Sequence, residues 1–333
     1  MIEHSRPWIT DADRAAVDHQ LISGMIASLE KTRQFERALN DRIGASGSIA
    51  TTSGTAALVL CLKALSIGPG DEVILPTYVC RNVMQAIVTT GAKPVLCDTG
   101  DFWNATERTI TDRFSSRTKA IVAVNIFGIS AELAGLREHP YLIIEDHCQS
   151  LGLPKPMFGA AAFYSFHAIK CLTSGEGGAA AFSDRAILSR ASELKDAHNP
   201  AGAMSDLQAV LGLSQLSRYD RMLARRREIA ERYFAELPAR MTSKIAEVAS
   251  HSIFFRFPLC MGGDFDSIQS RFGDRGVAVR RGVDQLLHRL VGQSDSDFPS
   301  AVALFNCTVS IPIYPAMSDD EVDKVIEAVK AVA

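Results

Sequence analysis

The chain has 333 residues, 47% of them hydrophobic, and this length suits two domains or one large domain with a smaller appendage. The formal net charge is −3 and the isoelectric point is about 6.3, a balance that gives no global attraction for nucleic acid or an anionic membrane. No apolar stretch reaches the roughly 18 residues that a membrane span requires, so we expect neither partner.

Helical patterns and apolar runs alternate through the first half of the chain. The predicted helices are 11–42, 55–66, about 82–90 and about 131–138, and the predicted strands are 72–75, 94–98, 120–127, 142–146, 160–166 and 178–182. Short apolar strands separated by helices indicate βαβ units and a largely parallel, buried sheet. In such sheets ligands collect at the carboxyl ends of the strands.

A long helical region follows from about 206 to 236, and Pro238 ends it because proline cannot continue a helix. The later elements are a strand-like run at 252–258, a helix near 265–273 and a closing helix at 319–332, capped by Ser318 or Asp319. The predicted division is a large domain at 1–237, with the N-terminal segment included, and a small domain at 238–333.

The cysteines and the N-terminus favour a soluble, cytoplasmic protein. Seven cysteines without close spacing argue against a disulfide framework, and no CxxC pair suggests zinc. Most of these cysteines lie in apolar runs, as reduced core thiols do. The N-terminus lacks a basic start followed by an apolar core, so we expect no signal peptide.

A small, polar turn at Ser53, Gly54 and Thr55 opens the predicted helix 55–66. Backbone N–H groups at the N-terminus of a helix form an anion site, so the turn is a candidate for binding phosphate. The alternative is an ordinary helix cap made by Ser53 or Thr55.

Two carboxylates, Glu145 and Asp146, end the strand predicted at 142–146. One of them can point into a cleft and face a cationic group; the alternative is a strand end that turns into solvent. His147 and Cys148 follow directly, but no second cluster at ligand spacing accompanies them, so we expect no metal site.

Lys170 follows the apolar strand at 160–166 and precedes a glycine-rich turn at 173–178. A buried lysine loses its charge readily, which suits covalent chemistry with a carbonyl group. The alternatives are a surface lysine and a lysine that holds phosphate by its charge. The order of glycines and lysine is not that of a P-loop.

The three features together are more specific than any one of them. A phosphate cradle, an acid at a strand end and a lysine at a strand end are the parts that a pyridoxal phosphate (PLP) site requires. The turn at 53–55 would hold the phosphate, Asp146 would pair with the protonated pyridine nitrogen, and Lys170 would carry the cofactor as a Schiff base and later move a proton.

At this point the chain resembles the DegT/DnrJ/EryC1/StrS family of PLP-dependent aminotransferases of nucleotide-linked and antibiotic sugars. The similarity covers nearly the whole chain. The matching segments are RPWITDADRAAV, SGTAAL, GAKPVLCD, EDHCQSLG, SFHAIKCLTSGEGG, MSDLQAVLGLSQL and SIPIYPAMSDDEVDKVIEAV. The resemblance implies a type I PLP aminotransferase fold of the α/β class, with a mostly parallel seven-stranded sheet and a small C-terminal α/β domain. It also implies a homodimer with shared active sites.

The resemblance assigns roles to individual residues. It implies that Lys170 is the covalent lysine, that Asp146 pairs with the pyridine nitrogen and that Gln149 lies near the phenolic oxygen of the ring. Phosphate ligands would come from Ser53, Gly54, Thr55 and Ser165, and sugar contacts from His167, Arg281 and His288.

Lysine at position 170 also separates two reactions in the family, because a dehydratase branch has histidine there. The resemblance therefore implies transfer of an amino group from L-glutamate, or glutamine, to a keto sugar in surface-polysaccharide or secondary-metabolite biosynthesis. SFHAIK is similar to the branch that acts on UDP-linked 4-keto-6-deoxy hexoses. Alternatives are a PLP enzyme that acts on a non-sugar or by dehydration, and a non-catalytic regulatory member.

The chain departs from the family beside the expected cofactor. Family members commonly stack an aromatic residue on the ring two positions past Tyr78, where this chain has Cys80. Either Tyr78 shifts in to stack, or Cys80 leaves the ring more loosely held.

A second departure precedes MSDLQ, where the family usually has Asn-x-Arg and the asparagine reaches the partner subunit's phosphate. The aligned positions here are Ala201 and Ala203, and Asn199 would substitute only after a rearrangement of the loop. The segment after Gln149 is also short, which predicts a different substrate cleft.

Overall fold

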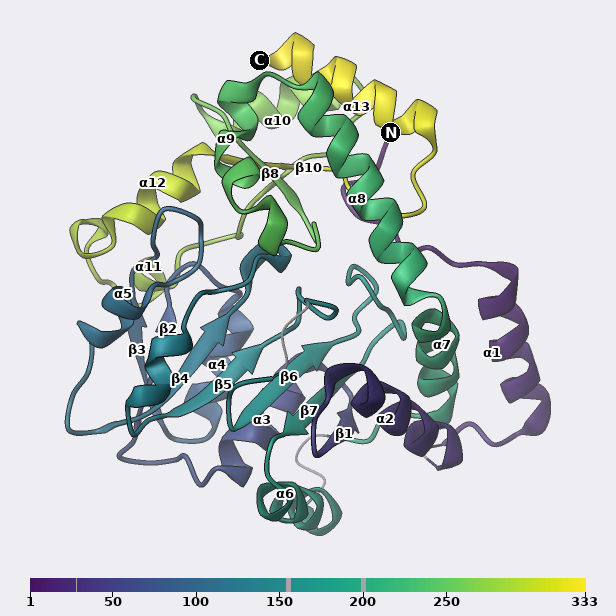
Figure 1. Cartoon of the computed structure of the whole chain (residues 1–333), viewed down its shortest axis with the longest axis vertical. Helices are drawn as coiled ribbons and strands as arrows, with labels where there is room; N and C mark the ends of the chain where they lie inside the picture. Colours follow the sequence, from purple (N-terminus) through teal and green to yellow (C-terminus); the bar gives the residue numbers. More distant parts are fainter. Residues whose placement is uncertain (28, 154–156, 199–201) are drawn as a thin grey trace.

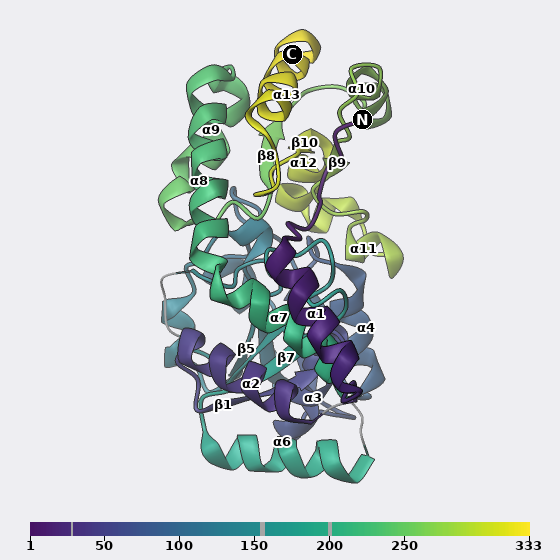
Figure 2. The same cartoon turned by 90° about the vertical axis from the view of Figure 1, so that its right-hand side faces the viewer.

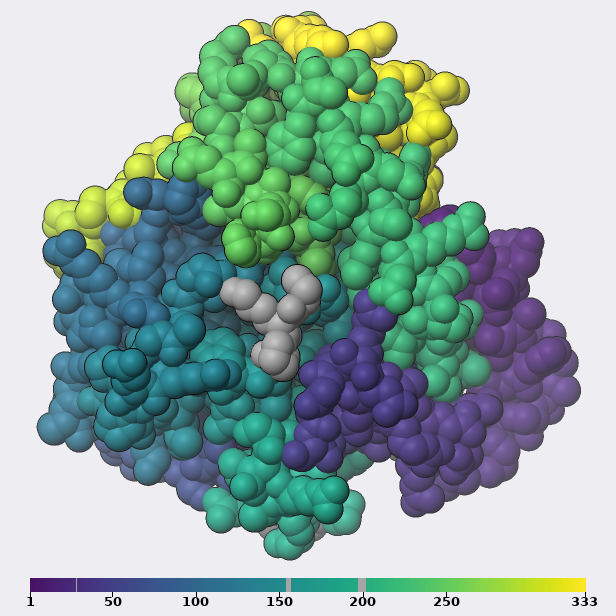
Figure 3. Space-filling model, in the orientation of Figure 1, coloured from purple at the N-terminus to yellow at the C-terminus, as the bar shows by residue number. Residues whose placement is uncertain are grey.

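The computed structural model describes residues 1–27, 29–153, 157–198 and 202–333. A seven-stranded sheet organises the main region (residues 11–217), and a three-stranded sheet organises the C-terminal region (residues 239–332). Figure 1 shows the C-terminal region above the main region, with α8 (Tyr219–Glu236) running from one to the other. The space-filling view shows the same arrangement, with green and yellow atoms above blue and purple ones (Figure 3).

The large sheet has the strand order β1-β7-β6-β5-β4-β2-β3. Its strands are β1 (Gly47–Thr51), β2 (Glu72–Pro76), β3 (Lys93–Cys97), β4 (Thr118–Val124), β5 (Leu142–Asp146), β6 (Ala161–Ser165) and β7 (Gly178–Phe182). β7 runs antiparallel to β1 and β6, and the pairs from β6 to β3 are parallel. Most strand residues are buried, which is why they form apolar runs. The predicted seven-stranded, mostly parallel sheet is confirmed.

Helices cover both faces of this sheet. They are α1 (Asp11–Ser23), α2 (Glu30–Ile43), α3 (Gly54–Ala64), α4 (Arg81–Thr89), α5 (Glu107–Thr111), α6 (Arg185–His198) and α7 (Asp206–Ser217). Figures 1 and 2 show α2 and α3 on opposite faces. The Asp206 carboxylate accepts hydrogen bonds from the backbone N–H groups of Leu29 and Thr32, so the start of α7 caps the start of α2.

The small sheet of the C-terminal region is antiparallel, in the order β8-β10-β9. Its strands are β8 (Phe257–Cys260), β9 (Arg280–Arg281) and β10 (Thr308–Ile311). The helices are α9 (Ala239–Glu247), α10 (Phe265–Gly273), α11 (Leu287–Leu290), α12 (Pro299–Cys307) and α13 (Asp319–Val332). A capping box of Ser318 and Glu321 starts α13, so Ser318 is the cap.

The first residues of the chain lie against the C-terminal region. Ile2 forms a parallel β-bridge with Val277, and the His4 ring nitrogen Nε2 lies 2.9 Å from the Ser310 hydroxyl. Figure 2 shows this segment running from α1 up to the small sheet. The domain boundary near Pro238 stays a prediction.

Three predicted elements differ from the structure around one turn. The strand predicted at 120–127 ends at Val124, because Phe127 (φ 59°) and Gly128 (φ 79°) adopt left-handed conformations that end a strand. The run predicted as a strand at 252–258 crosses this turn, where the Ile253 N–H donates to the Gly128 carbonyl, and the strand itself is β8. The helix predicted at 131–138 is a 3₁₀ helix, Ala134–Glu138.

The helical regions predicted at 11–42 and 206–236 each contain two helices. Gly24 (φ 69°) ends α1 before α2 begins, and Arg218 (φ −121°, ψ 16°) leaves the helical conformation between α7 and α8. Sequence patterns missed β1, β9, β10 and the helices α5, α6, α9, α11 and α12. Several of these elements, such as β9, α5 and α11, are too short for periodicity to give a clear signal.

Candidate active site

Lys170 lies in a turn that the chain ties back to the end of β6. The Phe166 N–H donates to the Gly177 carbonyl at 2.8 Å, and the Ser174 N–H donates to the Phe166 carbonyl at 2.9 Å. The Lys170 side chain is half-buried, and its Nζ lies 5.3 Å from the ring centre of Phe255. The lysine therefore lies where the main region meets the segment that precedes β8.

Asp146 is the last residue of β5, and only 6% of it is exposed. Its Oδ1 accepts a hydrogen bond of 2.9 Å from the Cys148 N–H. Burial raises the pKa of the Asp146 carboxyl, and the hydrogen bonds from Cys148 and the charges of Lys170 and His147 oppose that rise. A buried carboxylate of this kind needs a cationic partner, which a protonated ring nitrogen provides.

The turn that opens α3 packs on the ends of β6 and β7. The Ser53 hydroxyl accepts a hydrogen bond of 3.1 Å from the Ala56 N–H and so caps α3. A Cβ atom at Gly54 would lie 3.0 Å from Ser165 Cβ and 3.1 Å from Cys148 Sγ. A Cβ at Gly178 would collide with the Ser53 backbone. The turn thus reaches the strand ends that carry Asp146 and Ser165.

Ser53 therefore has the ordinary capping role that we considered as the alternative. This role does not exclude the phosphate role, because one hydroxyl satisfies one of the four N–H groups that a helix leaves free at its N-terminus. Thr55 is half-buried in the same first turn of α3. Phosphate binding at this turn stays a prediction.

Gln149 is fixed by a hydrogen bond to the turn after β4. Its side-chain oxygen accepts a bond of 2.7 Å from the Phe127 N–H. A Cβ at Gly128 would lie 3.0 Å from the Gln149 carbonyl, so the two segments are in close contact. This bond orients the amide group and explains part of the left-handed conformation at Phe127.

Tyr78 and Cys80 follow β2 and have different surroundings. Tyr78 is fully buried, its ring packs edge-on at 6.2 Å from Phe127, and a Cβ at Gly282 would collide with its hydroxyl. Cys80 is exposed at the start of α4, and its charge acts to raise the pKa of Cys148. The contacts of Tyr78 hold it in the core, so a shift of Tyr78 onto the ring would break them. A ring held more loosely beside Cys80 stays a prediction.

The residues expected at the sugar have their polar groups engaged elsewhere. The Arg281 guanidinium lies 4.3 Å from the ring centre of Phe265 and 3.6 Å from Asp266. His288 is fully buried, with its ring nitrogens 2.8 Å from the Thr77 hydroxyl and 2.9 Å from Asp295. Their contact with substrate stays a prediction.

The remaining predicted residues lie on the turn after β6 and in the segment before α7. The partly exposed His167 ring is 3.4 Å from Glu176 and accepts a hydrogen bond of 3.3 Å from the Ile169 N–H. Asn199 and Ala201 lie outside the described residues. Ala203 is half-buried.

Sequence reasoning missed two residues beside the site. Phe255 contacts the lysine amine, and its only signal was the apolar run that we interpreted as a strand. The His147 ring stacks on Tyr164 at 5.3 Å, lies 2.8 Å from the Ser150 hydroxyl and lies 3.2 Å from Glu145. The pair Glu145–His147 therefore forms a buried network directly beside Asp146.

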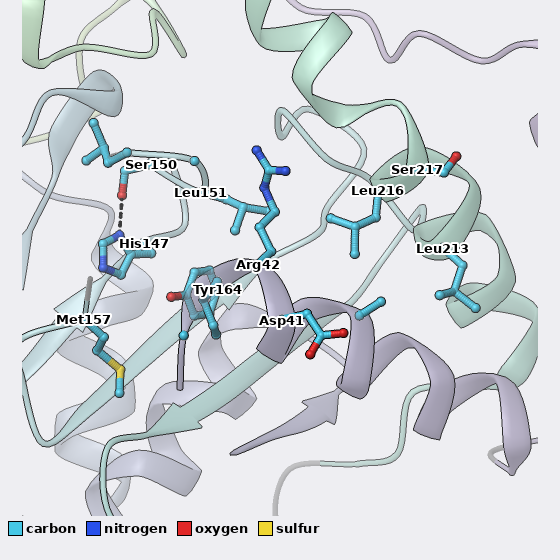
Figure 4. A pocket seen from close by; sticks show the side chains of 15 residues that line it. Asp41, Arg42, His147, Ser150, Leu151, Met157, Tyr164, Leu213, Leu216 and Ser217 are labelled. Atoms are coloured by element: carbon cyan, nitrogen blue, oxygen red, sulfur yellow. Dashed lines mark hydrogen bonds between the residues drawn. The ribbon is translucent and has the colours of Figure 1, made fainter. Parts of the chain in front are cut away.

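His147 and Tyr164 line a pocket of about 920 Å³ (Figure 4). Asp41 and Arg42 reach it from α2, and α7 closes it with Leu213, Leu216 and Ser217. Successive side chains of a strand point to opposite faces of the sheet, so Tyr164 and Ser165 face different sides. The pocket is therefore on the face opposite to the predicted phosphate site.

Neither a membrane-spanning helix nor a metal site is found among the described residues. No helix in them is long and apolar enough to cross a membrane. The same residues contain no group of three or more histidine, cysteine, aspartate or glutamate side chains placed to hold a metal ion.

The family described as the DegT/DnrJ/EryC1/StrS aminotransferase family matches residues 7–330. The chain belongs to this family. The resemblance seen in the motifs is confirmed, and with it the expected class of enzyme, an aminotransferase.

Relatives match over almost their whole length. SpsC of Bacillus subtilis, a spore coat polysaccharide biosynthesis protein, is 30% identical over 99% of this chain and 96% of its own. The aminotransferase TlmJ of Streptoalloteichus hindustanus is 27% identical over 100% of this chain and 98% of its own, with a TM-score of 0.89. Spr1654 of Streptococcus pneumoniae, assigned as a sugar aminotransferase, is 26% identical in its PLP form, with a TM-score of 0.86 over 99% and 97% of the two chains.

These structures confirm the predicted fold, that of the PLP aminotransferases. Spr1654 is known in a PLP form and a PMP form, the two states between which the cofactor of an aminotransferase alternates. The cofactor expected from Lys170, Asp146 and the turn at 53–55 is thus the cofactor of relatives with this fold. PLP-dependent amino transfer is the reaction class of this family member.

Proposed function

We propose that this aminotransferase moves an amino group from L-glutamate to the keto carbon of a nucleotide-linked sugar, with a 4-keto-6-deoxy hexose as the expected acceptor. The family and its named relatives support a sugar, since SpsC belongs to polysaccharide biosynthesis and Spr1654 is assigned as a sugar aminotransferase. Lysine rather than histidine at position 170 supports transamination over dehydration.

The observation that carries this proposal is the convergence of three distant segments at one edge of the sheet. The turn at Gly54 packs so closely on Ser165 and Cys148 that an added Cβ would lie only 3.0 and 3.1 Å from them, and Cys148 donates its N–H to Asp146. The charge of Lys170 acts on both Asp146 and Cys148. A helix N-terminus, a buried carboxylate and an amine are therefore adjacent, which supports the proposed cofactor site.

These residues fit the cofactor in charge as well as in position. When bound, PLP supplies an aldehyde that reacts with amines and a ring that withdraws electrons from the substrate carbon. The N-terminus of α3, with Gly54, Thr55 and Ser165, would hold the phosphate dianion. Asp146 would keep the ring nitrogen protonated, and the cation would in turn offset the cost of burying that carboxylate.

Lys170 would attach the cofactor through Nζ and would take and return the proton at the reacting carbon. The ring of Phe255 lies beside that amine, with its centre 5.3 Å from Nζ. The ring therefore limits the directions from which a substrate can approach the amine. Gln149, held by the Phe127 N–H, would lie near the phenolic oxygen.

We also propose a homodimer with shared active sites. Apolar side chains are exposed together at the end of α1 and in the segment that follows, namely Leu21, Ile22, Met25, Ile26 and Leu29. Exposed apolar side chains that gather along one segment are typical of an interaction surface, and we infer a second copy of the chain as its occupant from the resemblance to the family. Sedimentation at twice the chain mass of 36.1 kDa is the expected result.

The test combines a substitution of Lys170, with a matched control, and a comparison of sugar and non-sugar acceptors. Lys170→Ala should lower kcat by at least about 10³-fold, while Lys119→Ala, an exposed lysine on β4, should not change it. With L-glutamate as donor, mass spectrometry should find an amino sugar from a UDP-linked 4-keto-6-deoxy hexose. Full turnover by Lys170→Ala would refute the assigned lysine. Amino transfer to non-sugar ketones alone would refute the assigned acceptor.

A further inference from the structure

Two cysteines of the C-terminal region lie in contact, far from Lys170 in the sequence. Cys260 ends β8, Cys307 ends α12, and their sulfur atoms are 2.9 Å apart. The backbone fixes both residues, because Cys260 pairs in register with Thr308 and the Met261 N–H donates to the Cys307 carbonyl at 2.8 Å. The two sulfurs are thus within about 1 Å of the disulfide bond length of about 2.05 Å.

The two thiols differ in acidity. The hydrogen bond with Cys260 lowers the pKa of Cys307 to about 7, and Thr308 and the charge of Lys244 also lower it against the effect of burial. The same bond and burial raise the pKa of Cys260 well above its ordinary range. One sulfur is therefore poised as the thiolate and the other as its proton donor. This pairing is typical of reactive dithiols.

Small molecules can reach both sulfurs. Cys307 borders a hollow of about 320 Å³ that Asp101 and Lys244 also line, and the Lys244 Nζ donates to the Asp101 carbonyl at 3.2 Å. Cys260 borders a second hollow, of about 240 Å³, beside Arg240 and Arg271. Of these charged groups, Lys244 lowers the pKa of both thiols, which favours the thiolate form.

We propose that Cys260 and Cys307 form a redox-sensitive site that closes reversibly into a disulfide on reaction with a hydroperoxide. The Cys307 thiolate attacks one peroxide oxygen and breaks the O–O bond, so the sulfur is oxidised to the sulfenic acid and the other oxygen leaves as water or an alcohol after protonation. Cys260 then attacks the Cys307 sulfur, and the hydroxyl leaves as water. A dithiol reductant returns both thiols by exchange.

The other cysteines are less suited to this chemistry. Cys61, Cys97 and Cys171 are buried, and Cys148 lies inside the predicted cofactor site. Cys80 is exposed. Cys260 and Cys307 thus combine contact, partial exposure and a lowered pKa at one sulfur.

The disulfide would stiffen the small sheet where it meets the main region. Cys307 is followed by Thr308, whose hydroxyl accepts a hydrogen bond of 2.8 Å from the Trp103 indole N–H. The cross-link would join residues 47 positions apart and so reduce the freedom of the unfolded chain. We expect oxidised protein to melt several degrees above reduced protein, with the shift reversed by dithiothreitol.

The experiment treats the purified holoenzyme with hydrogen peroxide and maps its thiols by peptide mass spectrometry. The expected product is a peptide pair linked through Cys260 and Cys307, lighter by two hydrogens and restored by dithiothreitol. Cys260→Ser and Cys307→Ser should abolish the link and the melting shift. Cys80→Ser, which removes an exposed thiol outside the pair, should keep both.

Alkylation before any peroxide treatment tests the same site by a second measurement. At pH 7 iodoacetamide should modify Cys307 before Cys260, and in Cys260→Ala, which removes the hydrogen-bond donor, the rate at Cys307 should fall several-fold. The proposal would be overturned if peroxide oxidised Cys80 while Cys260 and Cys307 remained free thiols, or if iodoacetamide modified neither thiol of the pair in the folded protein.

Discussion

The edge of the large sheet and the C-terminal region contrast in how they use their polar side chains. At the sheet edge, the charge of Lys170 acts on Asp146, and neither side chain forms a salt bridge with another described residue. In the C-terminal region, Arg281 is held between aromatic rings and Asp266, and His288 is bonded at both nitrogens. Unsatisfied polar groups at a strand edge indicate a ligand site, whereas satisfied ones indicate packing.

The strongest test of this contrast is Asp146→Asn. Loss of the carboxylate removes the charge that keeps the ring nitrogen protonated, so kcat should fall by about 10²–10³-fold. Asp112→Asn, at the exposed end of α5, is the control and should keep full activity. A steady-state assay with L-glutamate and a keto sugar measures both, and an Asp146→Asn enzyme within a factor of ten of wild type would contradict the role of Asp146.

Gly54→Ala tests the phosphate turn. The new Cβ would lie 3.0 Å from Ser165 Cβ and 3.1 Å from Cys148 Sγ, which is tighter than ordinary contact. We expect PLP to bind about 10-fold more weakly, a loss of about 1.4 kcal/mol from a shifted turn. Gly273→Ala in α10 has open space around it and should bind PLP normally. If a fluorescence titration gave Gly54→Ala the same affinity for PLP as wild type, the turn would not contribute to cofactor binding.

The stability of the cofactor-free protein should depend on pH through Asp146. Burial raises the pKa of this carboxyl in the folded state, so its contribution to stability falls as the pH rises above the ordinary aspartate value of about 3.9 and levels off above the raised pKa. Apo Asp146→Asn should therefore melt a few degrees above apo wild type at pH 7, and the gap should narrow at pH 4–5. Calorimetry across this range measures it. If the difference in melting temperature between the two proteins did not change with pH, Asp146 would not be the group that makes stability depend on pH.

Arg281→Ala should have the smallest effect. The stacking of Arg281 on Phe265 and Phe305 and its ion pair with Asp266 hold it within the C-terminal region, so we expect the KM for the sugar to change by less than about threefold. The melting temperature should fall slightly. A tenfold rise in KM with unchanged kcat would instead establish Arg281 as a sugar contact, as the resemblance implies. That result would contradict the contrast between the two regions.

The parts of the fold that the sequence predicted are those with strong local signals. The apolar strands β5 and β7, the helix α10 and the capped helix α13 were predicted with the bounds that the structure has. The turn after β4 was not, because Phe127 is a large apolar residue in a left-handed conformation that close contact with Gln149 and residues 253–256 imposes. Contacts between distant segments carry no periodic signal.

The residues of the candidate site also divide into those that lie in local motifs and those that are placed by contacts between distant segments. Lys170, Asp146 and the turn at 53–55 lie in short motifs beside strand ends, so their order along the chain was enough to predict that they share one edge. Phe255 and His147 were not predicted. No local sequence pattern distinguishes an aromatic ring that contacts a distant amine, or a histidine that bonds to residues near it in the chain. Arg281 and His288 were assigned by resemblance alone, in a region where β9, β10, α11 and α12 had not been predicted.

The most direct test is to locate the lysine that binds the cofactor. Borohydride reduction of the purified PLP-loaded enzyme fixes the cofactor to its lysine, and peptide mass spectrometry then identifies the modified residue. The expected result is a single modified peptide that contains Lys170, with no modification in Lys170→Ala. Modification of a different lysine in wild-type protein, or the absence of any modified peptide from enzyme that turns over, would contradict the account.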